Sequence, residues 1–151
     1  MNDTVIADSS YLVALFDGAD ALHAQALALA SGSTLRTVFL DCVMNEVLSV
    51  LGKRAEEKKR LPDLPPMYAK ILQKIPPPLL VWTYREVPDR YGEIVSMMGE
   101  HLGRLNFHDC LIALTARDLG IAGVISFDAD FDRLNWLRRL ARPEDVMPLG
   151  D

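Results

Sequence analysis

The sequence has few of the features that mark secreted and membrane proteins. It has only two cysteines, Cys42 and Cys110, and each lies in an apolar segment where a small buried thiol fits, which argues against a disulfide scaffold. No uninterrupted apolar run approaches the roughly 20 residues needed to cross a bilayer. The first four residues carry none of the positive charge that begins a secretory leader. We therefore expect a cytoplasmic protein that does not enter a membrane.

A surplus of positive charge is also missing. The chain has 21 Asp and Glu against 16 Lys and Arg, a formal net charge of -5, which argues against binding nucleic acid through a bulk positive field. With 151 residues, 50% of them hydrophobic and 25% charged, it has the size and composition of one globular domain over residues 1–151. A chain of this length buries roughly two thirds of the surface that it exposes when unfolded, so it needs neither disulfides nor a structural metal to fold.

Short β-branched runs alternate with apolar or amphipathic segments along the chain. We predict strands at residues 4–7, 35–40, 79–84 and 122–127, and a short edge strand at 145–149. We predict helices at residues 11–16, 20–30, from 42 into the basic segment 53–60, and at 67–74, 89–102, 107–119 and 131–140. Asp41 and Asn106 are the expected N-caps, and Gly120 follows a helix C-terminus. This alternation predicts an α/β fold with a mainly parallel sheet covered by helices on both faces.

Four acidic residues stand where an isolated charge is costly. Asp8 follows the first predicted strand and Asp128 follows the fourth, which places both at the carboxyl edge of the sheet, where such folds bind ligands. Asp109 lies in the first turn of a helix that is otherwise apolar almost all round, and Glu46 has apolar neighbours one turn away on either side. An unpaired ionised carboxylate in such surroundings is strongly destabilising, and ion pairing or metal coordination is the usual remedy.

Each acid by itself also has an ordinary structural explanation. Asp109 can complement the dipole of its helix, and Asp8 and Asp128 can cap neighbouring helices. For any single acid, capping is the better explanation. The four together, with no equally buried run of Arg or Lys to pair them, favour a shared cation. Carboxylates without a supporting set of His or Cys suit a hard ion, so we expect Mg²⁺, with Mn²⁺ as a substitute.

Other kinds of site fit the sequence less well. The three histidines lack the spacing of zinc ligands, and His108 is better explained as a residue bonded locally at a helix N-terminus. The acidic run at 128–132 resembles the start of a calcium loop, but arginines occupy the positions that require Gly and Glu. No phosphate-binding glycine loop follows a strand. Ser10 lacks the glycines of a nucleophile elbow, and it can instead bond to the turn or orient Asp8.

Four segments of the chain resemble the PIN-domain family, most closely its toxin nucleases of VapC type. They are Ile6-Ala7-Asp8-Ser9-Ser10 with the apolar residues 11–15, Asn45-Glu46-Val47-Leu48, the segment 107–116 around Asp109, and the segment 124–131 around Asp128. Each motif alone is weak. The ordered set spans nearly the whole chain in the family's order and is fairly specific.

The resemblance implies a three-layer PIN-like fold with a five-stranded parallel sheet, an acidic Mg²⁺ site and endoribonuclease activity. By this resemblance, the acidic site residues of the family correspond to Asp8, Glu46, Asp109 and Asp128. Of these, Asp8, Asp109 and Asp128 are the expected metal ligands, directly or through water, and Glu46 is a ligand or an orienter of the attacking water. The resemblance also implies a separately encoded antitoxin as a protein partner, and we expect a homodimer as well.

Three further residues could assist this site. Asp130 could replace or assist Asp128, Ser126 could bond to a ligand or a water, and Ser10 could orient Asp8. The proline-rich stretch at 62–78 matches no motif of the family.

RNA would have to approach this acidic pocket through local positive charge. Two groups of basic residues could grip phosphates beside the cut: Lys53, Arg54, Lys58, Lys59 and Arg60, and then Arg133, Arg138, Arg139 and Arg142. Solubilising helix faces explain each group equally well. Four of the 21 acidic residues are the proposed site, so the other 17 nearly balance the 16 basic residues, and most of the net charge is concentrated at that site.

Two other classes of function compete with a nuclease. A catalytically silent PIN-like module would act through protein binding, but the intact set of four acids disfavours it. A metal-dependent phosphatase with an aspartyl nucleophile would need Asp-x-Asp directly after its first strand, where this chain has Asp8-Ser9-Ser10.

Overall fold

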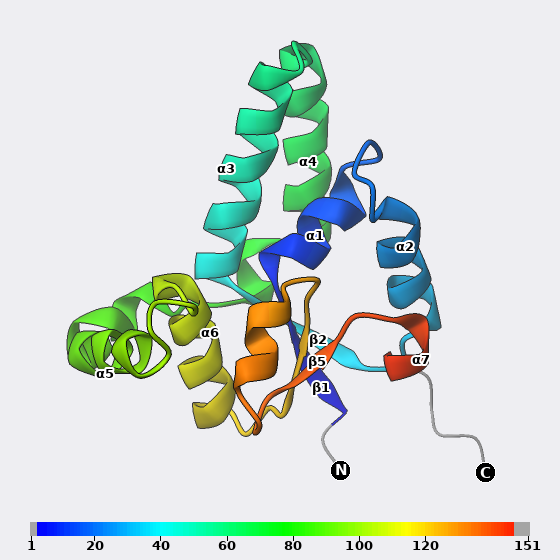
Figure 1. Ribbon diagram of the computed structural model, residues 1–151. Coiled ribbons are helices and arrows are strands. Elements are labelled where there is room, and N and C mark those ends of the chain that lie inside the picture. The colour runs from blue at the N-terminus through cyan, green and yellow to red at the C-terminus, as the bar shows by residue number, and fades with distance from the viewer. Residues whose placement is uncertain (1–2, 147–151) are drawn as a thin grey trace.

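A five-stranded sheet, parallel throughout, forms the centre of the computed structural model, which describes residues 3–146 (Figure 1). The strands are β1 (Thr4–Ala7), β2 (Arg36–Leu40), β3 (Leu80–Val81), β4 (Gly123–Ile125) and β5 (Arg138–Leu140). Their order across the sheet is β3-β2-β1-β4-β5, and every neighbouring pair is parallel. The expected parallel α/β architecture with five strands is confirmed.

Helices cover both sides of this sheet. In the described part of the chain the α-helices are α1 (Ser9–Phe16), α2 (His23–Gly32), α3 (Asp41–Glu57), α4 (Leu64–Lys74), α5 (Val87–Glu100), α6 (Phe107–Asp118) and the short α7 (Pro143–Val146). Helices α6 and α2 lie on opposite sides of the sheet, and α3 and α4 form a hairpin that projects beyond it (Figure 1). No helix within residues 3–146 is long and apolar enough to cross a membrane.

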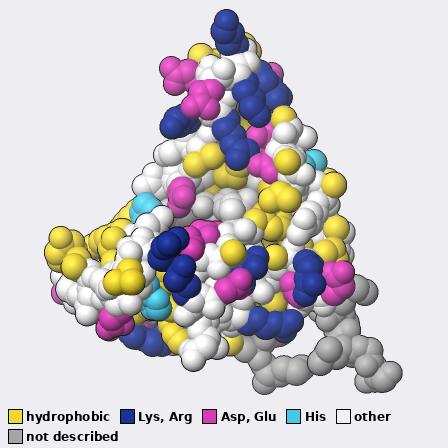
Figure 2. Space-filling model, viewed as in Figure 1, with side chains coloured by type: hydrophobic (Ala, Val, Ile, Leu, Met, Phe, Trp, Pro, Cys, Tyr) yellow, Lys and Arg dark blue, Asp and Glu magenta, His cyan; other side chains and the backbone are white. Residues whose placement is uncertain are grey.

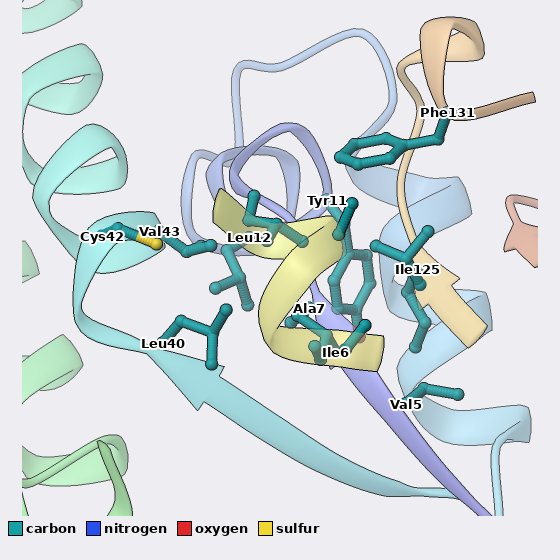
Figure 3. Close-up of a cluster of buried hydrophobic side chains, with 14 of the residues drawn as sticks. Val5, Ile6, Ala7, Tyr11, Leu12, Leu40, Cys42, Val43, Ile125 and Phe131 are labelled. Carbon is teal, nitrogen blue, oxygen red and sulfur yellow. The ribbon is translucent and has the colours of Figure 1, made fainter. Parts of the chain in front are cut away.

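The main core lies between the central strands and the helices that follow them. Ile6 and Ala7 of β1 and Ile125 of β4 are buried together with Leu12 of α1 and Leu40 of β2 (Figure 3). Removing one such aliphatic side chain from water contributes about 1.5–3 kcal/mol to folding. Because the central strands are apolar on both faces, they require helices on both, which is the physical basis of the three layers.

Helix α6 begins and ends as its sequence predicts. The Asn106 side chain accepts a hydrogen bond from the Asp109 backbone N–H (2.9 Å), and the Asp109 carboxylate accepts one from the Asn106 N–H (3.0 Å), which forms a capping box. Gly120 follows the helix with a φ of 67°, a conformation that favours glycine. All residues from 109 to 116 are buried. The capping box therefore fixes Asp109 at the start of a helix whose next two turns are enclosed in the core.

The predicted helix at 131–140 is wrong. A short 3₁₀ helix covers Ala129–Arg133, and the chain then extends into β5. The open edge of β4 accounts for the difference, because its backbone N–H and C=O groups would have no partner if residues 131–140 formed a helix. In β5 the Arg138 N–H donates to the Ala122 carbonyl (2.7 Å), and the Leu140 carbonyl accepts from the Ser126 N–H (3.1 Å).

The predicted strand at 79–84 shortens to the two residues of β3, and Asp41 is the reason. Asp41 is the first residue of α3, whose N-cap position is Leu40, contrary to the expected role, and within the helix its carboxylate accepts only from the N–H of its neighbour Cys42. Its carboxylate instead accepts hydrogen bonds from the backbone N–H groups of Thr83 and Tyr84 (2.7 and 3.1 Å). These two donors are therefore bound to Asp41, and the chain turns into a 3₁₀ helix at Tyr84–Glu86.

The start of α4 and the last predicted element also differ from the prediction. Helix α4 begins at Leu64 because Pro65 and Pro66 occupy its first turn, where a helix needs no backbone N–H donor. The predicted edge strand at 145–149 falls partly in α7. The Asp145 carboxylate stabilises the start of this helix, because it accepts hydrogen bonds from the backbone N–H groups of residues 141 and 142. Residues 147–149 lie outside the described part of the chain.

Candidate functional site

Pairing of β1 with β4 brings distant residues together at the carboxyl edge of the sheet. The register matches Ile6 with Val124 and Ala7 with Ile125, so the residues that follow, Asp8 and Ser126, lie side by side. The chain adds β2 and β3 on one side of β1 and later adds β4 and β5 on the other. A sheet with this order opens a crevice where the two halves diverge, which is where folds of this kind bind ligands.

Two serine hydroxyls hold the Asp8 carboxylate in this crevice. Its Oδ2 accepts hydrogen bonds from Ser126 Oγ (2.6 Å) and from Ser10 Oγ (3.0 Å). The same hydroxyl oxygens accept from backbone N–H groups, Ser126 from Asp128 (3.0 Å) and Ser10 from Phe127 (3.0 Å). Because each hydroxyl already accepts from the backbone, its proton is available to Asp8. Ser10 thus orients Asp8 directly, and so does Ser126, for which the sequence had indicated a ligand or a water as partner.

Asp8, Glu46, Asp109 and Asp128 line a single open cleft of about 730 Å³. They come from four places in the chain: the end of β1, the second turn of α3, the first turn of α6 and the loop after β4. Asp8 and Asp109 are buried, with 4% and 8% of their surface exposed. The Glu46 side chain is 38% exposed, so it lies at the rim of the cleft. The apolar residues around it in the sequence had predicted a more enclosed position.

Burial and mutual repulsion raise the pKa values of the two enclosed acids. Burial raises the pKa of Asp109 to about 7, and the charges of Asp8, Asp128 and Glu46 add to the effect against the opposing hydrogen bond from the Asn106 backbone. Burial also raises the pKa of Asp8, which outweighs the hydrogen bonds from Ser126 and Ser10. Both acids are thus in surroundings that disfavour their negative charge, and a bound cation would relieve this cost.

The oxygen-only donor set of the cleft fits a hard divalent cation in chemistry. Within residues 3–146, however, no three His, Cys, Asp or Glu side chains converge closely enough to hold an ion together. Binding a cation directly to three of these carboxylates would therefore require them to move closer together. The cleft does contain one basic side chain, Arg54, but its guanidinium is paired with Asp20 (2.6 Å) and Asp17 (3.2 Å).

Comparison with known proteins identifies the family. The family model described as "PIN domain" matches residues 5–137, which is most of the chain. The chain belongs to the PIN-domain family. The fold agrees with that of VapC20 from Mycobacterium tuberculosis, a protein described as a sarcin-ricin loop-cleaving toxin. The TM-score is 0.62 at 18% sequence identity, over 95% of this chain and 99% of that one. Among curated proteins, no sequence matches the chain.

The first basic group of this PIN domain lies mostly away from the cleft. Lys53, Lys58, Lys59 and Arg60 are exposed toward the tip of the α3–α4 hairpin, where Figure 2 shows basic side chains with acidic ones among them. Arg60 forms an ion pair with Asp63 (3.0 Å). Arg54 is the one member of this group that lines the cleft.

The second basic group is paired with acids of its own region. Arg133 lies 3.5 Å from Asp130, and Arg138 lies 4.0 Å from Asp145. Neither arginine lines the cleft, and nor does Asp130. Asp128 does line it, while its Oδ1 accepts a hydrogen bond from the Asp130 N–H (2.9 Å) and so caps the short 3₁₀ helix that follows.

Sequence analysis missed a chain of polar contacts beside Glu46. The Tyr84 hydroxyl accepts a hydrogen bond from the Asn45 side chain (2.8 Å) and contacts His108 Nε2 (3.0 Å). The other ring nitrogen of His108 lies 3.9 Å from Glu46 Oε2. His108 therefore contacts Tyr84, which is distant in the sequence, in place of the local hydrogen bond at the helix N-terminus that we expected. Tyr84 is 39 residues from Asn45 and 24 from His108, so no local pattern could have paired them.

Proposed function

We propose that this PIN domain is a Mg²⁺-dependent endoribonuclease, the toxin of a toxin–antitoxin pair. The observation that carries the proposal is the cleft with four carboxylates drawn from four separate elements, two of them buried and with raised pKa values. Membership of the PIN-domain family supports it, and so does a shared fold with VapC20, a toxin that cleaves RNA at the sarcin-ricin loop according to its description. At 18% identity the RNA target of VapC20 does not transfer to this chain.

We assign the metal to Asp8, Asp109 and Asp128, with Glu46 as a further ligand or as the group that orients the attacking water. A magnesium ion bound there would polarise the scissile phosphodiester, make a bound water more acidic and neutralise charge on the leaving oxygen. Ser10 and Ser126 keep Asp8 aimed into the cleft, and the capping box holds Asp109 in place in the cleft lining. Mn²⁺, with similar ligand preferences, should substitute.

The reaction follows from attack by water on a phosphorus atom of the RNA. The new bond forms between the water oxygen and phosphorus, and the bond from phosphorus to the ribose 3′-oxygen breaks. The attacking water loses one proton as the new bond forms, and the departing 3′-oxygen gains one and becomes a hydroxyl. The products carry 5′-phosphate and 3′-hydroxyl ends, whereas attack by the ribose 2′-hydroxyl would leave a 2′,3′-cyclic phosphate.

Cleavage of total cellular RNA by the purified protein tests the proposal. We expect cleavage with Mg²⁺ or Mn²⁺, none with EDTA, and new 5′-phosphate ends that sequencing can map. Asp8→Asn should be inactive but folded, because its amide oxygen can still accept from both serines. An active Asp8→Asn variant, or EDTA-resistant cleavage with 2′,3′-cyclic phosphate ends, would overturn the mechanism.

One observation favours a second candidate, a catalytically silent PIN module that acts through protein binding. No three ligands converge on one point among the residues that the structure describes. Titration with Mg²⁺ alone in a calorimeter separates the candidates: the enzyme should bind the ion in the wild type and lose it in Asp8→Asn. A phosphatase would instead hydrolyse small phosphate monoesters, and the same pair of proteins tests for that activity.

We propose a cognate antitoxin and a second copy of the chain as protein partners. Large apolar side chains lie exposed on the hairpin and on the α5 side, among them Leu72, Tyr91 and Leu102, which are 62%, 60% and 89% exposed. Surfaces of this kind commonly mark sites of protein association. Light scattering of the purified protein tests for the dimer, and co-purification with the product of the neighbouring gene tests for the antitoxin.

A further inference from the structure

A buried acid outside the proposed catalytic set organises the segment after β3. Asp41 is 6% exposed and does not line the cleft. Its carboxylate accepts four hydrogen bonds: from the backbone N–H of Cys42 (2.8 Å), from the N–H and hydroxyl of Thr83 (2.7 and 2.5 Å) and from the N–H of Tyr84 (3.1 Å). Three of these four bonds go to residues 83–84, so Asp41 attaches that segment to the first turn of α3.

The segment held by Asp41 presents the Tyr84 hydroxyl to two partners. The Asn45 amide nitrogen can only donate, so the Tyr84 oxygen accepts from it. The single proton of the hydroxyl is then available to His108, whose Nε2 lies 3.0 Å away. When the hydroxyl donates to Nε2, that ring nitrogen carries no proton, and the proton of neutral His108 is then on Nδ1.

The protonated nitrogen of His108 faces the acid at the cleft rim. His108 Nδ1 lies 3.9 Å from Glu46 Oε2. This distance is longer than a hydrogen bond, so the N–H attracts the carboxylate electrostatically or through one bridging water. Glu46 has the longest side chain of the proposed acids and is 38% exposed, so it loses the most rotamer freedom when it is held in place and gains the most from such a restraint.

We propose that Asp41 and Tyr84 are positioning residues that act on Glu46 through His108. Asp41 fixes the backbone of Tyr84, Tyr84 fixes the Nδ1–H tautomer of His108, and His108 restrains the Glu46 carboxylate at the rim of the cleft. Only the kinetic consequence rests on the proposed nuclease function. The hydrogen-bond chain and the restraint on Glu46 are properties of the metal-free protein.

Nuclear magnetic resonance of the metal-free protein tests the chain without any assay of activity. Ring nitrogen shifts of His108 should show the Nδ1–H tautomer in the wild type and a shift toward the Nε2–H tautomer in Tyr84→Phe. Couplings of the Glu46 Cβ protons should indicate one rotamer in the wild type and averaging in the variant. Tyr91→Phe, which removes an exposed hydroxyl on α5, is the matched control and should match the wild type. An Nε2–H tautomer in the wild type, or spectra of Tyr84→Phe that match the wild type, would overturn the inference.

A kinetic cycle then measures the consequence for RNA cleavage. Tyr84→Phe should lower the rate at saturating RNA and Mg²⁺ about tenfold while leaving KM unchanged, as is typical of a lost positioning contact. In a Glu46→Gln background the same change should have no further effect, because a residue that acts through Glu46 loses its effect when that carboxylate is absent. Equal losses in both backgrounds would contradict the proposed route. If the wild type cuts no RNA, the nuclease proposal fails and the tautomer result still decides this one.

Discussion

The Ser126 hydroxyl donates a hydrogen bond of 2.6 Å to the carboxylate of Asp8, a residue 118 positions earlier in the chain. The bond exists because β1 and β4 are parallel neighbours in register, which places the first residue after each strand at the same height. One oxygen of Asp8, a proposed metal ligand, is thus oriented by the residue that follows β4.

Ser126→Ala should destabilise the protein and weaken Mg²⁺ binding. The substitution removes one of the two hydroxyl donors to Asp8 Oδ2 and leaves the Asp128 N–H without its acceptor, and such losses cost about 1–3 kcal/mol. Urea denaturation gives the change in the free energy of unfolding. Ser96→Ala, at an exposed position on α5, is the control and should change it by less than about 0.5 kcal/mol. Equal stability of the two variants would show that the Asp8–Ser126 bond contributes nothing.

The metal-free protein should become less stable as the pH rises from 5 to 8. Folding raises the pKa of Asp109 from 3.8 to about 7 through burial, so between pH 5 and about 7 the unfolded chain has lost a proton that the folded protein keeps. Stability falls with pH wherever the folded state binds more protons. The raised pKa of Asp8 acts in the same direction.

Asp109→Asn should remove much of this fall, since it cannot ionise and can still accept the Asn106 N–H bond. Urea denaturation in EDTA at the two pH values should find it more stable than the wild type at pH 8 and similar at pH 5. Glu100→Gln, at an exposed position at the end of α5, should retain the wild-type slope. A wild type that is more stable at pH 8 would contradict the role assigned to these acids.

Asp41→Asn should be among the most damaging single substitutions outside the cleft. Burial tends to raise the pKa of Asp41, but hydrogen bonds from Thr83, Tyr84 and Cys42 outweigh it and hold that pKa below its usual value. An amide must turn its NH₂ group toward one of these donors, so we expect a loss of about 2–4 kcal/mol. Asp63→Asn, which removes an exposed ion pair with Arg60, should cost less than about 1 kcal/mol. Thermal unfolding of both variants makes the comparison, and similar losses would contradict the role of Asp41.

Arg54→Gln should act on stability, whereas Lys53→Gln should not. Arg54 joins α3 to Asp17 and Asp20, whose side chains are only 8% and 12% exposed, and its removal takes away the ion-pair partner of both carboxylates. We expect a loss of about 1–2 kcal/mol in urea denaturation. Lys53 is exposed one position away and serves as the control. If Arg54→Gln keeps its stability and loses only RNA affinity, the arginine binds RNA as its place in the basic group first indicated.

Much of the fold follows from local patterns in the sequence. The run at 107–119 contains its own N-cap, its apolar faces and its terminal glycine, so α6 could be predicted nearly to its ends. The strands β1 and β2 were also predicted within one residue, because β-branched runs before polar turns are local signals. The wrong predictions at 79–84 and 131–140 share one cause, because the conformation of each segment depends on hydrogen bonds to a residue outside it. The partner is Asp41 for the first segment and the edge of β4 for the second.

The candidate site divides in the same way. The sequence by itself predicted which carboxylates would be costly to bury, because they lie directly after an apolar strand or inside an apolar helix, and Asp8 and Asp109 are buried. Only the tertiary structure decided the contacts of the site. Ser126 donates a hydrogen bond to Asp8, His108 lies beside Glu46, and Arg54 forms ion pairs with Asp17 and Asp20. Hydrogen bonds and ion pairs act over a few ångströms in space, and the partners in these contacts are separated by tens of residues along the chain, so their pairing depends on strand order and register.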